Sequence, residues 1–301
     1  MDGTGSLPER LSEVARSSPG RLGVAIRDDG GWSWSFEAQR VSRSASTIKV
    51  AILLAVLRRV EEGRLDLADR VRVAPYEERV GGCGPLSLLP SVTALPLLEA
   101  LRLMIALSDN DATNAVLEHT ALLESGDVGR LLAEVPTRST RLRRRMMDPA
   151  SVAAGMENET CPQDLADLLA ALRTGRLVDP DLSALAVGML REQQFVAGLP
   201  AYLPAGVAVA AKTGDLPGLR ADMALLERDD RWVAVAVVAD GLGERSGTDA
   251  PDGDTGPAGR DRGTSVLPLF AQIGALAAER LDRNPQPPQV SGNPLRGGHS
   301  E

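Results

Sequence analysis

Strand-like segments occur near both ends of this chain, and helical patterns fill the sequence between them. Residues 21–28 and 31–36, separated by Asp28-Asp29-Gly30-Gly31, predict an N-terminal hairpin. Strand patterns return only at 207–213, 221–227 and 231–239. Each hairpin has an apolar face that it can bury by pairing with the other hairpin. We therefore expect one mostly antiparallel, five-stranded sheet built from the two ends of the chain.

The sequence between the strands has the periodicity of helices, with patterns at about 46–62, 96–107, 111–119, 162–174 and 182–193. Helices at 7–16 and about 264–282 lie next to the strands at each end. The predicted fold class is α+β, a sheet flanked by terminal helices with an inserted all-α lobe. We expect an α/β domain from residues 1–59 and 203–282 and an all-α domain from residues 60–202.

Two segments predict irregular structure. Residues 243–263 are rich in Gly, Asp, Pro and Ser and predict a mobile loop. The tail 283–301 contains Asn284-Pro285-Gln286-Pro287-Pro288 and is predicted to be disordered.

The composition excludes several classes of protein. The net charge of −8 argues against a nucleic-acid surface, and no apolar run approaches the roughly 18 residues that cross a bilayer. We expect a monomer that binds a small molecule and neither nucleic acid nor membrane. Cys83 and Cys161 lack metal-ligand spacing, so we expect no metal and no cofactor. We interpret the arginines at 138, 141, 143, 144 and 145 as a solvated face.

The start of the chain bears on its location. Met1 is followed by Asp2, Glu9 and Glu13, without a basic segment or an apolar stretch typical of a secretory signal. We expect a cytoplasmic protein as numbered, and a secreted one if a leader was removed.

Lysine is rare in this chain. Of the 33 lysines and arginines, only Lys49 and Lys212 are lysines. An arginine stays protonated near neutral pH, whereas burial or a neighbouring charge can make a lysine release its proton. Both lysines lie in short motifs that carry serines or follow a strand. The pattern indicates a site that needs two titratable amines.

Three motifs surround these lysines. Ser46-Thr47-Ile48-Lys49 runs into the apolar stretch 50–57, and in a helix Ser46 and Lys49 lie one turn apart. A neutral amine at that spacing can take the proton of the serine hydroxyl. Ser108-Asp109-Asn110 follows an apolar run, and Lys212-Thr213-Gly214 ends a strand pattern. Each triplet alone is weak, but the three in this order indicate acyl transfer to serine.

The three motifs resemble those of class A β-lactamases and penicillin-binding proteins, over roughly residues 8 to 282. Asn114 extends the second motif to S-D-N-x-x-x-N, and Thr160-Cys161-Pro162 resembles the T-x-P that opens the helix after the omega loop. Gly218 and Arg220 match the segment whose arginine binds the substrate carboxylate in many relatives.

The resemblance implies catalytic roles. Ser46 would attack an amide or lactam carbonyl, and Lys49 would take its proton. Ser108, polarised by Lys212, would pass a proton to the leaving nitrogen.

It also implies substrate-binding roles. The backbone N–H groups of Ser46 and Asp215, the residue after Gly214, would form an oxyanion hole. Asn110 would hold the side-chain amide of the substrate. Thr213 and Arg220 would bind a carboxylate, although Arg220 could instead pair with Asp222 or Glu227.

The omega loop departs from the class A pattern. Class A enzymes carry E-x-x-L-N there, and its glutamate activates the water that frees the acyl-enzyme. Between Ser108 and Pro162 this chain has no such sequence. Asp148, before Pro149, is the nearest match and a possible deacylation base, with Glu157 as another candidate.

Three functions remain open from the sequence. The first is a serine hydrolase that turns over β-lactams through an acyl-enzyme. The second is a D-alanyl-D-alanine peptidase or an acyltransferase acting on natural-product peptides that end in a carboxylate. The third is a penicillin-binding sensor or sequestering module that acylates without turnover.

Overall fold

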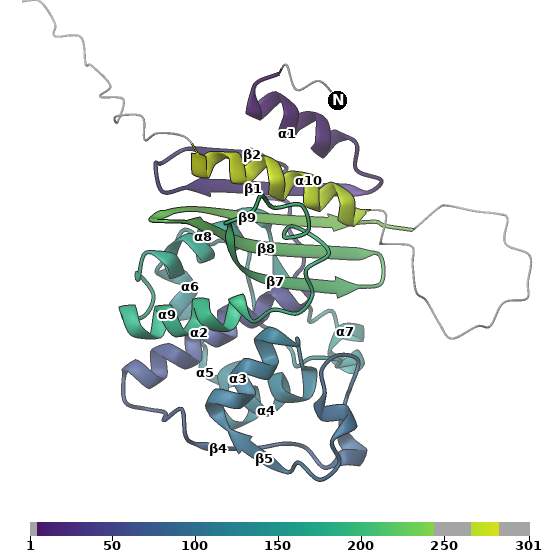
Figure 1. Ribbon diagram of the computed structural model, residues 1–301. Helices are drawn as coiled ribbons and strands as arrows, with labels where there is room; N and C mark the ends of the chain where they lie inside the picture. The colour runs from purple at the N-terminus through teal and green to yellow at the C-terminus, as the bar shows by residue number, and fades with distance from the viewer. Residues whose placement is uncertain (1–4, 244–265, 283–301) are drawn as a thin grey trace, which may run out of the picture.

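The computed structural model describes residues 5–243 and 266–282. Its centre is a five-stranded sheet in the order β2-β1-β9-β8-β7, with every neighbouring pair antiparallel (Figure 1). The strands are β1 (Arg21–Asp28), β2 (Ser33–Phe36), β7 (Ala208–Leu216), β8 (Leu219–Arg228) and β9 (Arg231–Asp240). The two ends of the chain join where β1 pairs with β9, so the predicted sheet is confirmed.

The terminal helices α1 (Leu7–Arg16) and α10 (Leu267–Ala278) cover one face of the sheet (Figure 1). Alternate residues along β9 face the two sides: Val235 and Val237 pack toward these helices, whereas Ala234 and Ala236 belong to the core on the opposite face. Because both faces are buried, β9 is apolar from Trp232 to Ala239 and β8 is apolar from Met223 to Leu226.

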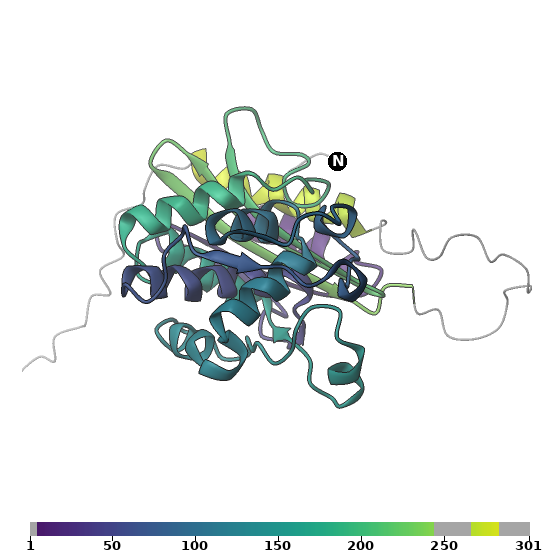
Figure 2. The same ribbon diagram turned by 90° about the horizontal axis from the view of Figure 1, so that it is seen from below.

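The remaining helices form a layer on the other face of the sheet, which Figure 2 shows from below. They are α2 (Ile48–Glu61), α3 (Leu97–Ala106), α4 (Asn110–Thr120), α5 (Leu122–Ser125), α6 (Asp127–Ala133), α7 (Pro149–Ala153), α8 (Pro162–Arg173) and α9 (Pro180–Arg191). The central helix α2 buries nearly all of its residues and is apolar on every side, as expected of a core helix. One hydrophobic core joins this layer to the sheet.

The sequence analysis did not predict several short helices and strands. Helices α5, α6 and α7 are four to seven residues long, too short for a periodic pattern. Left-handed residues at Ala121 and Gly126 separate α4, α5 and α6. Two small ladders were also missed: β3 (Ser42–Arg43) with β6 (Glu159–Thr160), and β4 (Arg70–Arg72) with β5 (Ala94–Pro96).

Several predictions concern residues outside the described ranges. The loop predicted at 243–263 lies outside them apart from Gly243, and the tail 283–301 lies outside them entirely. Within the described ranges, no helix is both long enough and apolar enough to cross a bilayer. The division into two domains stays a prediction.

Candidate active site

Ser46 lies in a single 3₁₀ turn, Ala45–Thr47, directly before α2. Ala45 adopts a left-handed φ of 46°. The Ser44 N–H donates to the Asn158 carbonyl at 2.8 Å, and the Thr47 hydroxyl donates to the Ser44 carbonyl at 2.7 Å. The turn is therefore fixed on both sides. It presents the half-buried Ser46 at the N-terminus of α2, where backbone N–H groups favour negative charge.

Strand β7 passes this turn at very close range. A Cβ atom at position 214 would lie 2.9 Å from the Ala45 Cβ, 3.1 Å from the Ser46 nitrogen and 3.2 Å from the Ser44 oxygen. Glycine is thus what allows the strand to approach the serine. The third motif consequently lies beside the first.

Replacing Gly214 by alanine is expected to push β7 away from the Ser46 turn. A displacement of about 1 Å at a reacting centre can cost about a hundredfold in rate, so covalent labelling of Ser46 by a β-lactam should slow by about that factor. Gly188→Ala is a matched control, because a Cβ there meets nothing within 4 Å. Labelling of Gly214→Ala at the wild-type rate would contradict this role for the close approach.

The two lysines meet at Ser108, although they are far apart in sequence. Lys49 Nζ donates to the Ser108 carbonyl oxygen at 2.6 Å and to Asn110 Oδ1 at 2.9 Å, and it lies 3.2 Å from Ser108 Oγ. Lys212 Nζ donates to Ser108 Oγ at 3.0 Å and to the Thr213 carbonyl at 2.8 Å. Both lysine side chains are completely buried. Ser108 Oγ is therefore in contact with both amines.

The hydrogen bonds of Lys49 within the described residues do not include Ser46. The expected serine–lysine spacing is nevertheless present, because Ser46 occupies the turn that leads into α2 and Lys49 is the second residue of that helix. The structure thus joins Lys49, Ser108, Asn110 and Lys212 by hydrogen bonds and places Ser46 beside Gly214.

The loop between α3 and α4 holds Ser108 in an unusual conformation. Its φ is 54°, a left-handed geometry that costs a non-glycine residue of order 1–3 kcal/mol and often occurs at functional sites. Asp109 supports it, because one carboxylate oxygen caps α4 through the Ala112 N–H and the other accepts from the Leu86 N–H. The Asn110 side chain also donates to the Gly81 carbonyl at 2.9 Å.

Burial shifts both lysines toward the neutral form. Burial, followed by the charge of Lys212, lowers the pKa of Lys49 well below its ordinary 10.5. Burial also lowers the pKa of Lys212 from 10.5 to about 7. A neutral lysine can act as a base, and an ammonium that titrates near neutrality can act as an acid.

The remaining substrate-binding candidates lie along β7 and β8. Thr213 contributes its carbonyl to Lys212, and its side chain is half-buried. Arg220 forms an ion pair with Asp215, its partner across the two strands. Asp222 and Glu227, the alternatives considered from sequence, are not the partners in this ion pair; Glu227 binds Arg173 and Arg191.

In the loop after α6, each carboxylate of residues 141–159 is held by a hydrogen bond or an ion pair. Both oxygens of Asp148 accept from Ser151, one from its N–H at 3.0 Å and the other from its hydroxyl at 2.6 Å. These hydrogen bonds lower the pKa of Asp148. Glu157 pairs with Arg144, and Glu159 pairs with Arg143 at 2.9 Å. Asp148 and Glu157 are thus each held in place, and the assignment of either as a deacylation base stays a prediction.

Asn114 fixes this loop to α4. Its side-chain amide accepts from the Met146 N–H at 2.8 Å and donates to the Met146 carbonyl at 3.1 Å. The residue held in this way is buried and apolar. Met147, which follows, lies beside Gly82, since a Cβ at that glycine would be 3.3 Å from the Met147 Cε and from Asn110 Nδ2. Methionines rather than carboxylates therefore occupy the loop positions next to the second motif.

Asp222 is a buried carboxyl that sequence reasoning considered only as a partner for Arg220. It is 2% exposed, and one oxygen accepts from the Leu199 N–H at 2.9 Å. The other oxygen has no hydrogen-bond partner among the described residues. Burial raises its pKa from 3.8 to about 7, and the charges of Asp222 and Lys212 act on each other. The signal that could have placed Asp222 near the site is its position opposite Thr213 in the pairing of β7 with β8.

The raised pKa of Asp222 predicts a pH dependence of stability. The folded protein keeps this proton up to about pH 7, whereas the unfolded chain loses it near 3.8, so the free energy of unfolding should fall as pH rises from 4 to 7. Asp222→Asn should remove this fall and be more stable than wild type at pH 8 by roughly 2–4 kcal/mol. Urea unfolding at pH 4 and 8 measures this. The exposed Glu13→Gln is the control, and an unchanged pH dependence in Asp222→Asn would refute the prediction.

No group of three or more His, Cys, Asp or Glu side chains is placed to hold a metal ion in residues 5–243 and 266–282. The groups that the structure brings together are two serines, two lysines and the side-chain amide of Asn110. These groups can form and break an acyl bond.

Solved structures and curated proteins resemble the chain. A "Beta-lactamase" of Rhodobacter capsulatus is 29% identical over 187 residues, which span 58% of this chain and 59% of that relative's length. A β-lactamase from Sphaerobacter thermophilus has a TM-score of 0.77 at 25% identity, covering 94% of this chain and 98% of its own. A point mutant of PBP-A, solved as an acyl-enzyme complex with penicillin G, has a TM-score of 0.74 at 23% identity, covering 92% of this chain and 96% of its own.

The chain matches less than two thirds of the length of the Rhodobacter capsulatus relative. At 23% identity, the similarity to PBP-A shows a shared fold only. The profile of the family described as "Beta-lactamase enzyme family" matches residues 6–256, which contain all three motifs. With its sheet, its helical layer and this match, the chain belongs to the beta-lactamase enzyme family.

Proposed function

We propose that this protein forms an acyl-enzyme on Ser46 with β-lactams or with related amides that carry a carboxylate. The observation that carries the proposal is the contact of Ser108 Oγ with both Lys49 and Lys212. That contact supplies a base beside the Ser46 turn and a proton route to a leaving nitrogen. Membership of the family and the fold support the same reaction class.

The number of donors and acceptors on Lys49 indicates whether it donates to or accepts from a serine hydroxyl. A neutral lysine amine has two N–H donors and one lone pair. The carbonyl of Ser108 and the Oδ1 of Asn110 use both donors of Lys49. Its lone pair is left for a hydroxyl, either that of Ser108 or that of Ser46 once substrate is bound.

Lys212 completes the route from the other side. As an ammonium it donates to Ser108 Oγ, which leaves the Ser108 proton free to move toward Lys49 or toward a leaving nitrogen. In the proposed reaction, Lys49 takes the Ser46 proton as Oγ attacks the carbonyl carbon. Ser108 then delivers a proton to the nitrogen as the C–N bond breaks, and it is reprotonated from Lys49.

The backbone supports the same step. The Ser46 N–H lies at the N-terminus of α2, and Gly214 brings the start of the Asp215 segment against that turn. Backbone N–H groups aimed at a developing oxyanion are worth several kcal/mol (about 3–4) of barrier in such sites. We assign the oxyanion hole to Ser46 and Asp215.

A carboxylate on the substrate would be bound by charge and by a hydroxyl. Lys212 supplies the ammonium, and Thr213 supplies the adjacent hydroxyl on the same strand. Arg220 is engaged with Asp215, so its contribution requires the guanidinium to exchange that carboxylate for the substrate's. The substrate class is therefore a β-lactam or a peptide ending in a carboxylate.

Hydrolysis of the acyl-enzyme needs a base positioned on a water molecule. The carboxylates of residues 141–159 are held by Ser151 and by arginines, which favours slow release of the acyl group. This favours the penicillin-binding alternative over a rapid β-lactamase. A mutant of PBP-A, which shares the fold, has been captured as an acyl-enzyme with penicillin G. We propose that the acyl-enzyme of this chain likewise persists.

Intact mass spectrometry with benzylpenicillin, followed over hours, tests the proposal. A stoichiometric adduct that persists while free penicillin remains supports acylation with slow deacylation. A transient adduct with complete loss of penicillin would overturn the slow step and leave a working β-lactamase. No adduct, together with cleavage of a D-alanyl-D-alanine ester or amide, would assign the site to the peptidase alternative.

The pKa of Lys212 predicts how acylation depends on pH. Binding of a carboxylate requires the ammonium, which the free protein loses as pH rises through about 7. The second-order rate constant for benzylpenicillin should therefore fall above pH 7, approaching tenfold per pH unit. A p-nitrophenyl acetate reaction, which lacks a carboxylate, should not show this fall. A benzylpenicillin rate that stays level from pH 7 to 9.5 would contradict the assignment.

A further inference from the structure

Asp111 is a buried carboxylate that the proposed reaction does not use. It lies in the first turn of α4, directly after Asn110, and is 4% exposed. Its Oδ1 accepts from the Val80 N–H at 2.8 Å, and its Oδ2 accepts from the Gly81 N–H at 3.1 Å. Both oxygens therefore hold the backbone of the segment 80–84, which contacts the second motif through a hydrogen bond from the Asn110 N–H.

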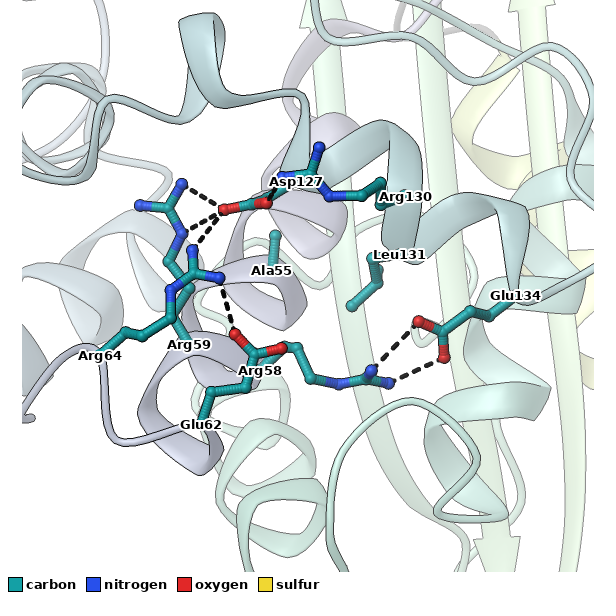
Figure 3. A pocket seen from close by; sticks show the side chains of 9 residues that line it. All are labelled: Ala55, Arg58, Arg59, Glu62, Arg64, Asp127, Arg130, Leu131 and Glu134. Carbon is teal, nitrogen blue, oxygen red and sulfur yellow. Dashed lines mark hydrogen bonds and ion pairs between the residues drawn. The ribbon is translucent and has the colours of Figure 1, made fainter.

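The partners of Asp111 differ from those of Asp127, a buried aspartate that ties α6 to α2. Figure 3 shows the Asp127 carboxylate among arginine side chains, and Arg59, Arg64 and Arg130 each pair with it. Within the described part of the chain, the hydrogen bonds of Asp111 come from backbone N–H groups and not from arginine or lysine. A buried carboxylate without a cation depends on its hydrogen bonds. The carboxylate and the backbone that it holds are therefore fixed together.

The segment 80–84 has little conformational preference of its own. Gly81 and Gly82 have φ values of 59° and 79°, in the left-handed region that favours glycine, and glycine loses the most conformational freedom on folding. At the other end of the segment, a Cβ at position 84 would lie 2.3 Å from Asp109. The segment is thus pressed against the second motif at one end, and the carboxylate hydrogen bonds fix it at the other.

Gly81 in turn orients the side chain of Asn110. The Gly81 carbonyl accepts from Asn110 Nδ2 at 2.9 Å, while Asn110 Oδ1 accepts from Lys49 Nζ at 2.9 Å. An amide carries donors on its nitrogen and an acceptor on its oxygen. If the amide were flipped, its oxygen would face the Gly81 carbonyl oxygen, and Lys49 would lose the acceptor of one N–H. The position of Gly81 therefore decides which end of Asn110 faces Lys49.

We propose that Asp111 is a positioning residue: by fixing Gly81, it orients Asn110 both for Lys49 and for the side-chain amide of the substrate. The Asn110 nitrogen has two N–H donors, and Gly81 uses one of them. The other N–H is the group that would donate to the carbonyl of the substrate's side-chain amide. The inference rests on the proposed function, because Asn110 binds this amide only in a protein that is acylated on Ser46.

Acylation by two penicillins tests the inference. Benzylpenicillin carries a side-chain amide, whereas 6-aminopenicillanic acid has the same lactam and carboxylate but an amine in place of that amide. In Asp111→Asn, an NH₂ group replaces one oxygen and faces a backbone N–H, so Gly81 is no longer held on both sides. Both second-order rate constants should fall, and the preference for benzylpenicillin should fall about tenfold, as expected for one lost hydrogen bond. Time-resolved intact mass spectrometry measures both rates.

Two further variants separate positioning from a loss of stability. Asp28→Asn is the matched control, because Asp28 is 3% exposed and its Oδ1 accepts from the backbone N–H groups of Gly30 and Trp32 in the β1–β2 turn. It should lower the melting temperature and keep the wild-type preference. Asn110→Ala should lose the preference by itself. Adding Asp111→Asn to it should change the preference no further, because both residues act through one amide.

The outcomes distinguish this inference from the proposed function. A folded Asp111→Asn protein with the wild-type preference, or a double variant in which the two losses add in full, would overturn the inference and leave the proposed function intact. If Asp111→Asn does not fold, Asp111→Ser replaces it, since its hydroxyl can still accept from one N–H, and the same loss of preference is expected. A wild-type protein that forms no adduct with either penicillin would remove the proposed function and the inference with it.

Discussion

Replacing Ser46 by alanine is expected to abolish covalent labelling by benzylpenicillin. The Ser46 hydroxyl is the group that the turn at 45–47 presents between the N-terminus of α2 and Gly214. Removing a nucleophile of this type costs several orders of magnitude, because no neighbouring group can form the same bond. We expect the second-order rate constant to fall by at least about a thousandfold. Time-resolved intact mass spectrometry measures it.

The control for this experiment is Ser44→Ala, two residues earlier. Ser44 is buried; its backbone N–H and carbonyl hold the turn, and its hydroxyl donates only to the carbonyl of the next residue, Ala45, at 3.2 Å. Its labelling should stay close to that of the wild type. An adduct that forms on Ser46→Ala at the wild-type rate would mean that another side chain is acylated.

Replacing Lys49 by arginine is expected to have the second-largest effect. Arginine keeps a positive charge on a long stem, but it does not release its proton near neutral pH. The site would lose its base and gain a fixed positive charge next to Ser108 and Asn110. General-base catalysis is typically worth 10²–10⁴-fold, so acylation should slow by about that amount.

The same substitution separates the proposed chemistry from a structural role. Circular dichroism and melting temperature should show that Lys49→Arg folds, and Lys49→Met should be equally slow without the charge. Methionine leaves the Ser108 carbonyl and Asn110 Oδ1 without their buried donor, at a cost of about 1–3 kcal/mol each. A folded Lys49→Arg protein acylated at the wild-type rate would exclude Lys49 as the base.

The fold was largely predictable from the sequence. Hairpins at both ends needed partners, and the strand pattern of 231–239 and the helical pattern of 46–62 matched elements that the structure contains. The family profile and the fold neighbours confirm the superfamily and the α+β class. The short helices were missed because four to seven residues carry too little periodic signal.

The site was predictable in its motifs but not in its tertiary details. Sequence order indicated that Ser46, Ser108 and Lys212 belong together. It did not reveal that Gly214 is needed for contact with the Ser46 turn, or that Ser108 is left-handed. Asp148 accepts its hydrogen bonds from Ser151 because it is the N-cap residue of α7. The burial of Asp222 depends on packing from distant segments, such as the one that contains Leu199. Such features arise from tertiary contacts rather than local patterns.

Only two lysines are present in the chain, so ¹³Cε-lysine labelling gives an NMR spectrum with two side-chain signals. Following their shifts with pH tests the central claim that both amines are tuned by burial. We expect both to titrate well below 10.5, and the signal missing from Lys212→Arg to titrate near 7. Two lysines that both titrate near 10.5 would contradict the account, because neither a neutral base nor a titrating acid would then be available to Ser46.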